Sequence, residues 1–426
     1  MNAALTSRIA EEYAAATREH LVPADARRAA AIAALAAQGL PTTRDENWKY
    51  ASLRALERQR FVPAAASTSP GTVRLPSPVA GFERYVFVDG RFAPGLSAAP
   101  GALFSALAAA SEPVAATTIA ARGTDQRLAL LNEAFATDGA RLKVAAGAAP
   151  ARLELVFVAQ ADEKTGPSYP RLQMSLAAGT TLELIERHVS AASAASFVNS
   201  ALEIDLGRGA RLTHYRLQEL SSRCTLFDTL NATLATEAAY HLHAISTGAL
   251  AARSTQTFRL AGEQAQLCMA IAALGDGPQV QDSFALVEHL VPRARTEQLF
   301  RGIAAGRARV AFNGKIVVAK HAAGTDSRQS LRGLLAGAQA EIDARPQLEI
   351  YTDDVRCSHG ASVGKLDDNM LFYLLSRGLD QDTAQRLLKW AFLADAFARI
   401  NVPELRRQIE ETLAEALRDS ALKELL

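Results

Sequence analysis

The chain has 426 residues, enough to bury most of the surface of its unfolded form without disulfides or metal ions to hold a small core together. Lysine and arginine number 46 against 45 aspartate and glutamate, which argues against the basic surface that a nucleic-acid or anionic-membrane binder carries. We therefore expect a protein partner, with no nucleic acid and no membrane.

Cysteine use and the start of the chain indicate a compartment. Three widely separated cysteines, Cys224, Cys268 and Cys357, cannot supply a disulfide framework and suit a reducing environment. The N-terminal segment has no cationic end leading into an apolar block, and no later run of about 18 uncharged apolar residues could span a bilayer. We expect a cytoplasmic protein.

The first third of the chain divides into three parts. Residues 1–62 predict an N-terminal helical region, in which Ile9 and Tyr13 share one helix face. Residues 63–80 are rich in Ala, Ser, Pro and Thr without an apolar period, which indicates a linker. Residues 81–149 predict a mixed strand and helix segment that contains an Asp-Gly turn.

A spaced repeat occupies residues 150–364, where short alternating apolar runs are separated by Gly- or Ala-rich corners. Four similar decapeptides, each a corner leading into a strand, begin 30, 28 and 26 residues apart, at Leu176, Leu206, Leu234 and Leu260. Weaker copies begin at Ile303 and Leu335. They keep about the same spacing if one degenerate turn lies between Leu260 and Ile303. Such a period without crossover helices favours a parallel β-helix, and a β-sandwich stays open as the alternative.

Residues 365–426 return to a helical period and predict a C-terminal helical domain. One helix carries Leu387, Leu388, Ala391 and Phe392 on one face, and the next carries an amphipathic stripe of Leu405, Ile409, Leu413 and Leu417. Helices at the end of a solenoid usually cap it, but residues 391–397 are apolar enough for part of them to contact a partner.

The sequence lacks the common catalytic signatures: it has no GxxxxGK[ST], GxSxG, HExxH or CxxC motif. Its sharpest local feature is Cys357-Ser358-His359. Alternate residues of an extended chain point the same way, about 6.6 Å apart, so a Cys357 sulphur and a His359 nitrogen could meet one metal ion. Two ligands are fewer than a cluster or structural zinc takes. Either another chain completes the site, or these are packing and turn residues.

The remaining histidines and cysteines are predicted to have structural roles. The same spacing in His241-Leu242-His243 predicts an outer face of the solenoid rather than a metal site. Four histidines without a second ligand nearby are expected to make hydrogen bonds on or between coils, namely His188, His214, His289 and His321. Cys224 and Cys268 are expected to act as small buried apolar groups.

Four segments carry a family resemblance. The longest is PQLEIYTDDVRCSHGASVGKLDDNMLFYLLSRGL, from Pro346 to Leu379, and three others support it, from Phe312 to Leu335, from Arg171 to His188 and from Arg44 to Leu53. On these segments the chain resembles the SufB/SufD family of iron-sulphur cluster assembly proteins over nearly its whole length. The chain is shorter than a typical SufB, and its segment CSHGASVGKLDD resembles the SufD version of this stretch. Both features favour the SufD branch.

The resemblance implies a mainly β protein, a right-handed parallel β-helix flanked by N-terminal and C-terminal helical regions. It implies a scaffold without catalytic residues that pairs with SufB through the β-helices and binds the ATPase SufC through residues 365–426. Cys357 and His359 would lie near the SufB interface, where SufB supplies the other ligands of a transient iron-sulphur cluster. No cluster would be bound stably by the chain alone, and a homodimer is possible in isolation.

Three alternatives stay open. The chain could be a SufB-type paralogue. It could be a polysaccharide-active β-helix enzyme, for which Asp353-Asp354 is the one tempting carboxylate pair, although neighbours in a strand point to opposite faces. It could also be a stand-alone metal-binding protein, which would hold iron without a second subunit.

Overall fold

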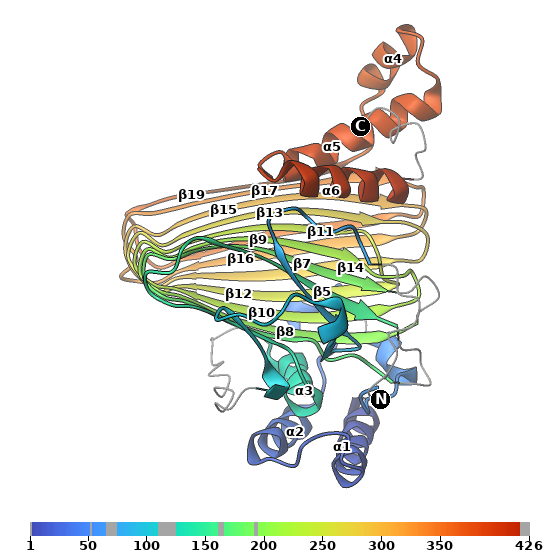
Figure 1. Ribbon diagram of the computed structural model, residues 1–426. Helices are drawn as coiled ribbons and strands as arrows, with labels where there is room; N and C mark the ends of the chain where they lie inside the picture. Colours follow the sequence, from blue (N-terminus) through green and yellow to red (C-terminus); the bar gives the residue numbers. More distant parts are fainter. Residues whose placement is uncertain are drawn as a thin grey trace.

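Two sheets facing each other form the body of the protein (Figure 1). The structure is a computed structural model that describes residues 2–51, 53–64, 75–109, 125–160, 166–190 and 195–417. The first sheet contains β1 (Glu83–Val88), β2 (Arg91–Phe92), β5 (Ala151–Ala159), β7 (Thr181–Ser190), β9 (Arg211–Glu219), β11 (Ala239–Ser246), β13 (Gln266–Gly275), β15 (Arg295–Ala305), β17 (Thr325–Ala336) and β19 (Val355–Gly364). The second contains β3 (Phe104–Ala106), β4 (Ala140–Val144), β6 (Arg171–Leu176), β8 (Phe197–Leu206), β10 (Thr225–Leu234), β12 (Ala251–Leu260), β14 (Val280–His289), β16 (Arg309–Val318) and β18 (Glu341–Ile350).

From β4 onward, each coil of chain gives one strand to each sheet, and strands of successive coils pair in parallel. The decapeptide starts are aligned by this pairing, because Leu206 pairs with Leu176 in the coil before it and with Leu234 in the coil after it. The predicted parallel β-helix is therefore confirmed. The β-sandwich alternative is wrong, since from β4 onward strands adjacent in sequence belong to different sheets.

The two weaker repeat copies were assigned to the wrong edge of the solenoid. Ile303 pairs with Leu274 in the first sheet, whereas the position equivalent to Leu260 in the next coil is His289, in the second sheet. Both edges of the solenoid turn through small residues, so a Gly- or Ala-rich corner does not reveal which edge it belongs to.

Leucine, valine and phenylalanine fill the space between the sheets. Leu206, Leu234 and Leu260 stack there with at most 3% of their surface exposed. Each fully buried side chain of this size contributes about 1.5–3 kcal/mol through the hydrophobic effect. The alternation of the strands therefore puts one face of each sheet into this interior and the other face outward.

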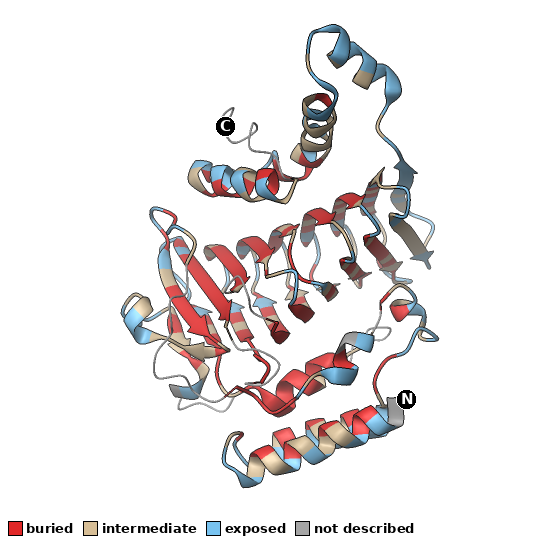
Figure 2. Ribbon diagram, turned by 90° about the vertical axis from the view of Figure 1, so that its right-hand side faces the viewer, coloured by how far each residue is buried: buried red, intermediate tan, exposed pale blue. Residues whose placement is uncertain are grey.

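Helices at both ends of the chain cover the outer faces (Figures 1 and 2). Residues of α1 (Asn2–Arg18), α2 (Ala26–Gln38) and α3 (Arg127–Phe135) share a hydrophobic cluster with outward residues of the second sheet, and α5 (Gln381–Phe397) and α6 (Pro403–Ala416) cover the first. Short 3-10 helices span Glu46–Trp48, Arg54–Arg58, Pro94–Leu96 and Leu107–Ala109. The predicted terminal helical regions are thus confirmed.

One helix differs from the others: α4 (Asp368–Ser376) projects away from the body and has no buried residue (Figure 2). Among the described residues, no helix is long and apolar enough to cross a membrane. Parts of the predicted linker, mixed segment and C-terminal domain, residues 65–74, 110–124 and 418–426, lie outside the described residues. The domain boundaries stay a prediction.

Candidate functional site

The solenoid ends in an open coil. β18 and β19 are the last strands of their sheets, so each has one edge without a strand partner in the described part of the chain. Val318, buried in the coil before, is fully covered, whereas Ile350, which pairs with it in β18, is 38% exposed. Interior side chains are therefore left uncovered at this end.

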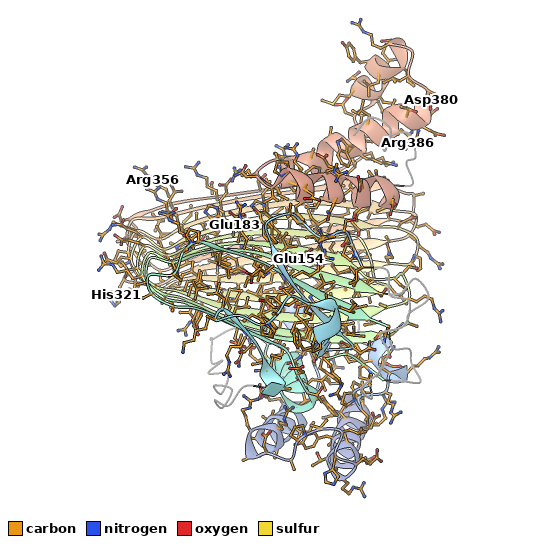
Figure 3. The ribbon with its side chains drawn as sticks, viewed as in Figure 1. Glu154, Glu183, His321, Arg356, Asp380 and Arg386 are labelled. Carbon is orange, nitrogen blue, oxygen red and sulfur yellow. The ribbon has the colours of Figure 1, made fainter. Side chains whose placement is uncertain are left out.

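Cys357 and His359 lie on this open coil, in β19. They pair with Ser327 and Gln329 of β17, which are buried. Cys357 is partly buried and packs against the solenoid interior, while His359 is exposed. The strand spacing thus gives both side chains the same face, and Arg356 points to the opposite side, into solvent (Figure 3).

The chain by itself gives these two residues few additional ligands. Burial raises the pKa of the Cys357 thiol, and the Ser327 hydroxyl offsets part of that effect. The thiol is therefore protonated at neutral pH until a base takes its proton or a metal ion displaces it. Within the described ranges, no group of three His, Cys, Asp or Glu side chains could hold a metal ion. Cys357 and His359 therefore have no third ligand of these types among the described residues.

The interior of the solenoid holds a polar cluster that the sequence did not predict. Glu186 accepts hydrogen bonds from Arg216 and lies 2.7 Å from His188 Nε2 and 3.0 Å from His214 Nε2. Arg216 also donates to both carboxylate oxygens of Asp228. Burial alone would raise the pKa of Glu186, but Arg216 and the two histidines hold it well below its usual range.

Three of the four histidines have the hydrogen-bonding role expected of them. His188 and His214 make hydrogen bonds inside the solenoid, and His289 Nε2 lies 2.9 Å from Thr296 Oγ1. His321 lies exposed at a corner (Figure 3). The signal that could have revealed the cluster is the alternation itself, since Glu186, like Leu182 and Leu184, occupies an inward position of β7.

A second group lies on the outer face of the first sheet. His241 pairs with Cys268 of the neighbouring strand, and both line a cavity of about 480 Å³ beneath Arg399. His243 lines it too; burial lowers the pKa of His243 to about 4, and its Nδ1 has no hydrogen-bond partner among the described residues. The outward position of both histidines was predicted correctly. Cys268, expected to be a small buried apolar group, is only partly buried, because its outward strand position puts it at this cavity. Cys224 is buried as expected.

The C-terminal helices divide into a packed part and an uncovered part. In α6, Leu405, Ile409 and Leu413 are buried, as their spacing predicted. Within residues 391–397, the apolar members Leu393, Ala396 and Phe397 pack on the first sheet, and contact of the remaining part with a partner stays a prediction. The uncovered apolar side chains lie instead mainly on α4, at Met370, Phe372, Tyr373 and Leu375.

Comparisons with known proteins bear on this arrangement. Residues 157–392 match the model of the SufBD core domain, described as SUF system FeS cluster assembly. The chain is 34% identical to the iron-sulphur cluster assembly protein SufD of Escherichia coli over 91% of its own length and 87% of that protein. The chain belongs to the SufB/SufD family. An iron-sulphur cluster assembly SufBD family protein of Synechocystis is 27% identical over 91% of this chain and 90% of its own length. Within the family, the identity to SufD favours the SufD branch.

Proposed function

We propose that the chain is a SufD-type scaffold subunit for iron-sulphur cluster assembly, which pairs with a SufB-type subunit through the open end of its β-helix. The observation that carries this proposal is the uncovered last coil, because an unpaired strand edge above exposed interior residues is a surface that another sheet can continue. The proposed pairing would add strands beyond β18 and β19.

The proposed cluster site is shared between the two subunits. Cys357 and His359 would contribute ligands from this chain, and the partner would contribute the rest, so that a transient cluster forms only in the complex. Soft sulphur and imidazole donors suit iron-sulphur chemistry. No bond-breaking step is assigned to this chain.

The proposed docking element for the ATPase SufC is α4 with the adjoining end of α5. Phe372 is 71% exposed and Met370 60%, on a helix with no buried residue. Several large exposed apolar side chains on one short helix are characteristic of a protein contact. The cytoplasm is the proposed location, supported by three cysteines that form no disulfide.

The experiment that tests this proposal uses the complex reconstituted from this chain, a SufB-type subunit and SufC. His359→Ala is expected to leave assembly of the complex intact and to reduce cluster build-up, followed by absorbance and iron content. Arg356→Ala is the matched control, because it changes an exposed residue of the same strand on the opposite face. Normal build-up with His359→Ala would remove His359 from the site.

A further inference from the structure

The residue beneath His359 has unusual surroundings. Gln329 pairs with His359 between β17 and β19, and only 4% of its surface is exposed. Neighbouring strands lie about 4.8 Å apart, and paired residues project to the same side. The amide of Gln329 therefore lies in the solenoid interior directly below the exposed imidazole.

The orientation of this amide is settled by its partners. Gln329 Nε2 donates to the backbone oxygen of Gly314 at 2.9 Å and to Gln298 Oε1 at 2.7 Å. A backbone carbonyl can only accept a hydrogen bond, so the nitrogen of Gln329 must face Gly314. Gln298 is oriented in turn, because its own Nε2 faces the sulphur of Met269 at 3.5 Å.

A glycine makes room for the two amides. A Cβ atom at Gly314 would lie 2.7 Å from Gln329 Nε2 and 2.8 Å from Gln298 Oε1. Any other residue at this position would push the amides away from the strand opposite. Gly314 therefore lets the amides approach the backbone of β16 closely enough to be held by it.

The amide oxygen of Gln329, Oε1, is buried and lacks a hydrogen-bond partner among the described residues. A buried carbonyl oxygen without a partner is unfavourable and uncommon in folded proteins. Since the nitrogen faces Gln298 in the preceding coil, the oxygen diverges from that side, and His359 is the residue that follows in the next coil.

We propose that Gln329 is a positioning residue for His359: its Oε1 accepts a hydrogen bond from one ring N–H, which leaves the other ring nitrogen free to bind a metal. Ligand histidines generally donate their second ring nitrogen to such an acceptor, which sets the tautomer and the direction of the ring. The two groups are not hydrogen-bonded in the structure, so the bond forms when the exposed His359 ring turns toward Gln329 Oε1. This inference rests on the proposed function of His359.

The first test reads the ring itself in the purified full chain. With ¹⁵N-labelled histidine, the ring signals of His359 are assigned by comparison with His359→Ala. A hydrogen-bonded ring N–H that exchanges slowly with water is expected in the wild type. Gln329→Met, which has similar length but no acceptor, is expected to lose it. Gln281→Met is the matched control, a buried interior glutamine on β14, and is expected to keep it.

The second test reads cluster build-up in the reconstituted complex. Loss of an outer-shell partner typically lowers activity or metal affinity by about 10- to 100-fold, and Gln329→Met is expected to slow build-up by that order, with Gln281→Met unchanged. Identical His359 ring signals in the wild type and Gln329→Met would overturn the positioning role, whatever the build-up. If His359→Ala builds clusters normally while Gln329→Met alters the ring signals, the proposed function fails and the positioning role stands.

Discussion

Burial holds two histidines neutral in the folded protein. It lowers the pKa of His243 and of His289 to about 4 each, from an ordinary value of 6.5. His289 lies inside the solenoid against Thr296, and His243 lies under the C-terminal helical region. In the part of the chain that the structure describes, no carboxylate is hydrogen-bonded to either ring, so protonation of these rings disfavours the folded state.

A loss of stability in mild acid follows from these two values. Between about pH 6.5 and pH 4 the unfolded chain binds protons at these histidines that the folded chain does not, so stability is complete above that window and falls as the pH is lowered through it. His289 accounts for about 2 kcal/mol of the loss between pH 7 and pH 5, from the difference between its folded and unfolded pKa. His289→Gln is expected to reduce the drop in unfolding free energy by that amount, measured with denaturant at both pH values.

The control separates titration from hydrogen bonding. Thr296→Val removes the 2.9 Å contact with His289 Nε2 but leaves the imidazole able to titrate. It is expected to lower stability at both pH values and to keep the wild-type difference between them. An unchanged pH dependence in His289→Gln would contradict this account of burial.

The candidate site was partly predictable at the residue scale. The spacing of Cys357 and His359 correctly placed both side chains on one face, because alternation in a strand is local geometry. Their unequal exposure was not predictable, since it depends on which coil is the last. Gln329 could not be singled out, because its importance comes from a pairing 30 residues along the chain.

At the scale of elements, the repeat was predictable from sequence and its edges were not. The leucine that ends β6, β8, β10 and β12 recurs because every coil must fill the same interior position, which is why Leu206, Leu234 and Leu260 are aligned. At the equivalent position of the next coil, His289 replaces leucine and the signal is lost. A similar pattern, an apolar residue followed by a small-residue corner, occurs at Ile303 on the opposite edge of the solenoid. For that reason Ile303 was assigned to the wrong edge.

The segment around Trp48 illustrates an element whose role only the structure explains. Trp48 is 2% exposed and packs on Phe227, with the Arg253 guanidinium 4.7 Å from its ring centroid. Arg253 also donates to the backbone oxygen of Asn47 at 2.6 Å. The contacts of Asn47 and Trp48 therefore hold the N-terminal region against the second sheet.

Trp48→Ala is expected to lower stability by about 3–5 kcal/mol, because it removes a large buried ring and leaves a cavity. The loss is expected to be local: amide exchange should increase in residues 41–51 and stay slow in β10 and β12. Trp390→Ala, at a partly exposed position of α5, is the comparison and should cost less. Unchanged exchange in residues 41–51 of Trp48→Ala would show that other contacts hold this segment.

At the scale of the whole molecule, two uncovered surfaces lie in different places. One is the open coil formed by β18 and β19, and the other is α4, which projects from the body (Figures 1 and 2). The outer faces of both sheets are already covered by helices of the same chain. Under the proposed function, the end of the solenoid and α4 would be independent sites for two proteins.

Independence of the two surfaces can be tested by crossed substitutions. Phe372→Asp puts a charge on α4, and Tyr351→Asp puts one directly after β18; the two side chains are 71% and 61% exposed. Because both are exposed in the isolated chain, neither change is expected to shift its thermal unfolding midpoint by more than about 1–2 °C. Phe372→Asp should abolish capture of SufC and retain the SufB-type subunit, and Tyr351→Asp should do the reverse, as measured by co-purification from defined mixtures. If each substitution weakened both partners equally, the two surfaces would be parts of one interface, and the separate roles assigned to the solenoid end and to α4 would be wrong.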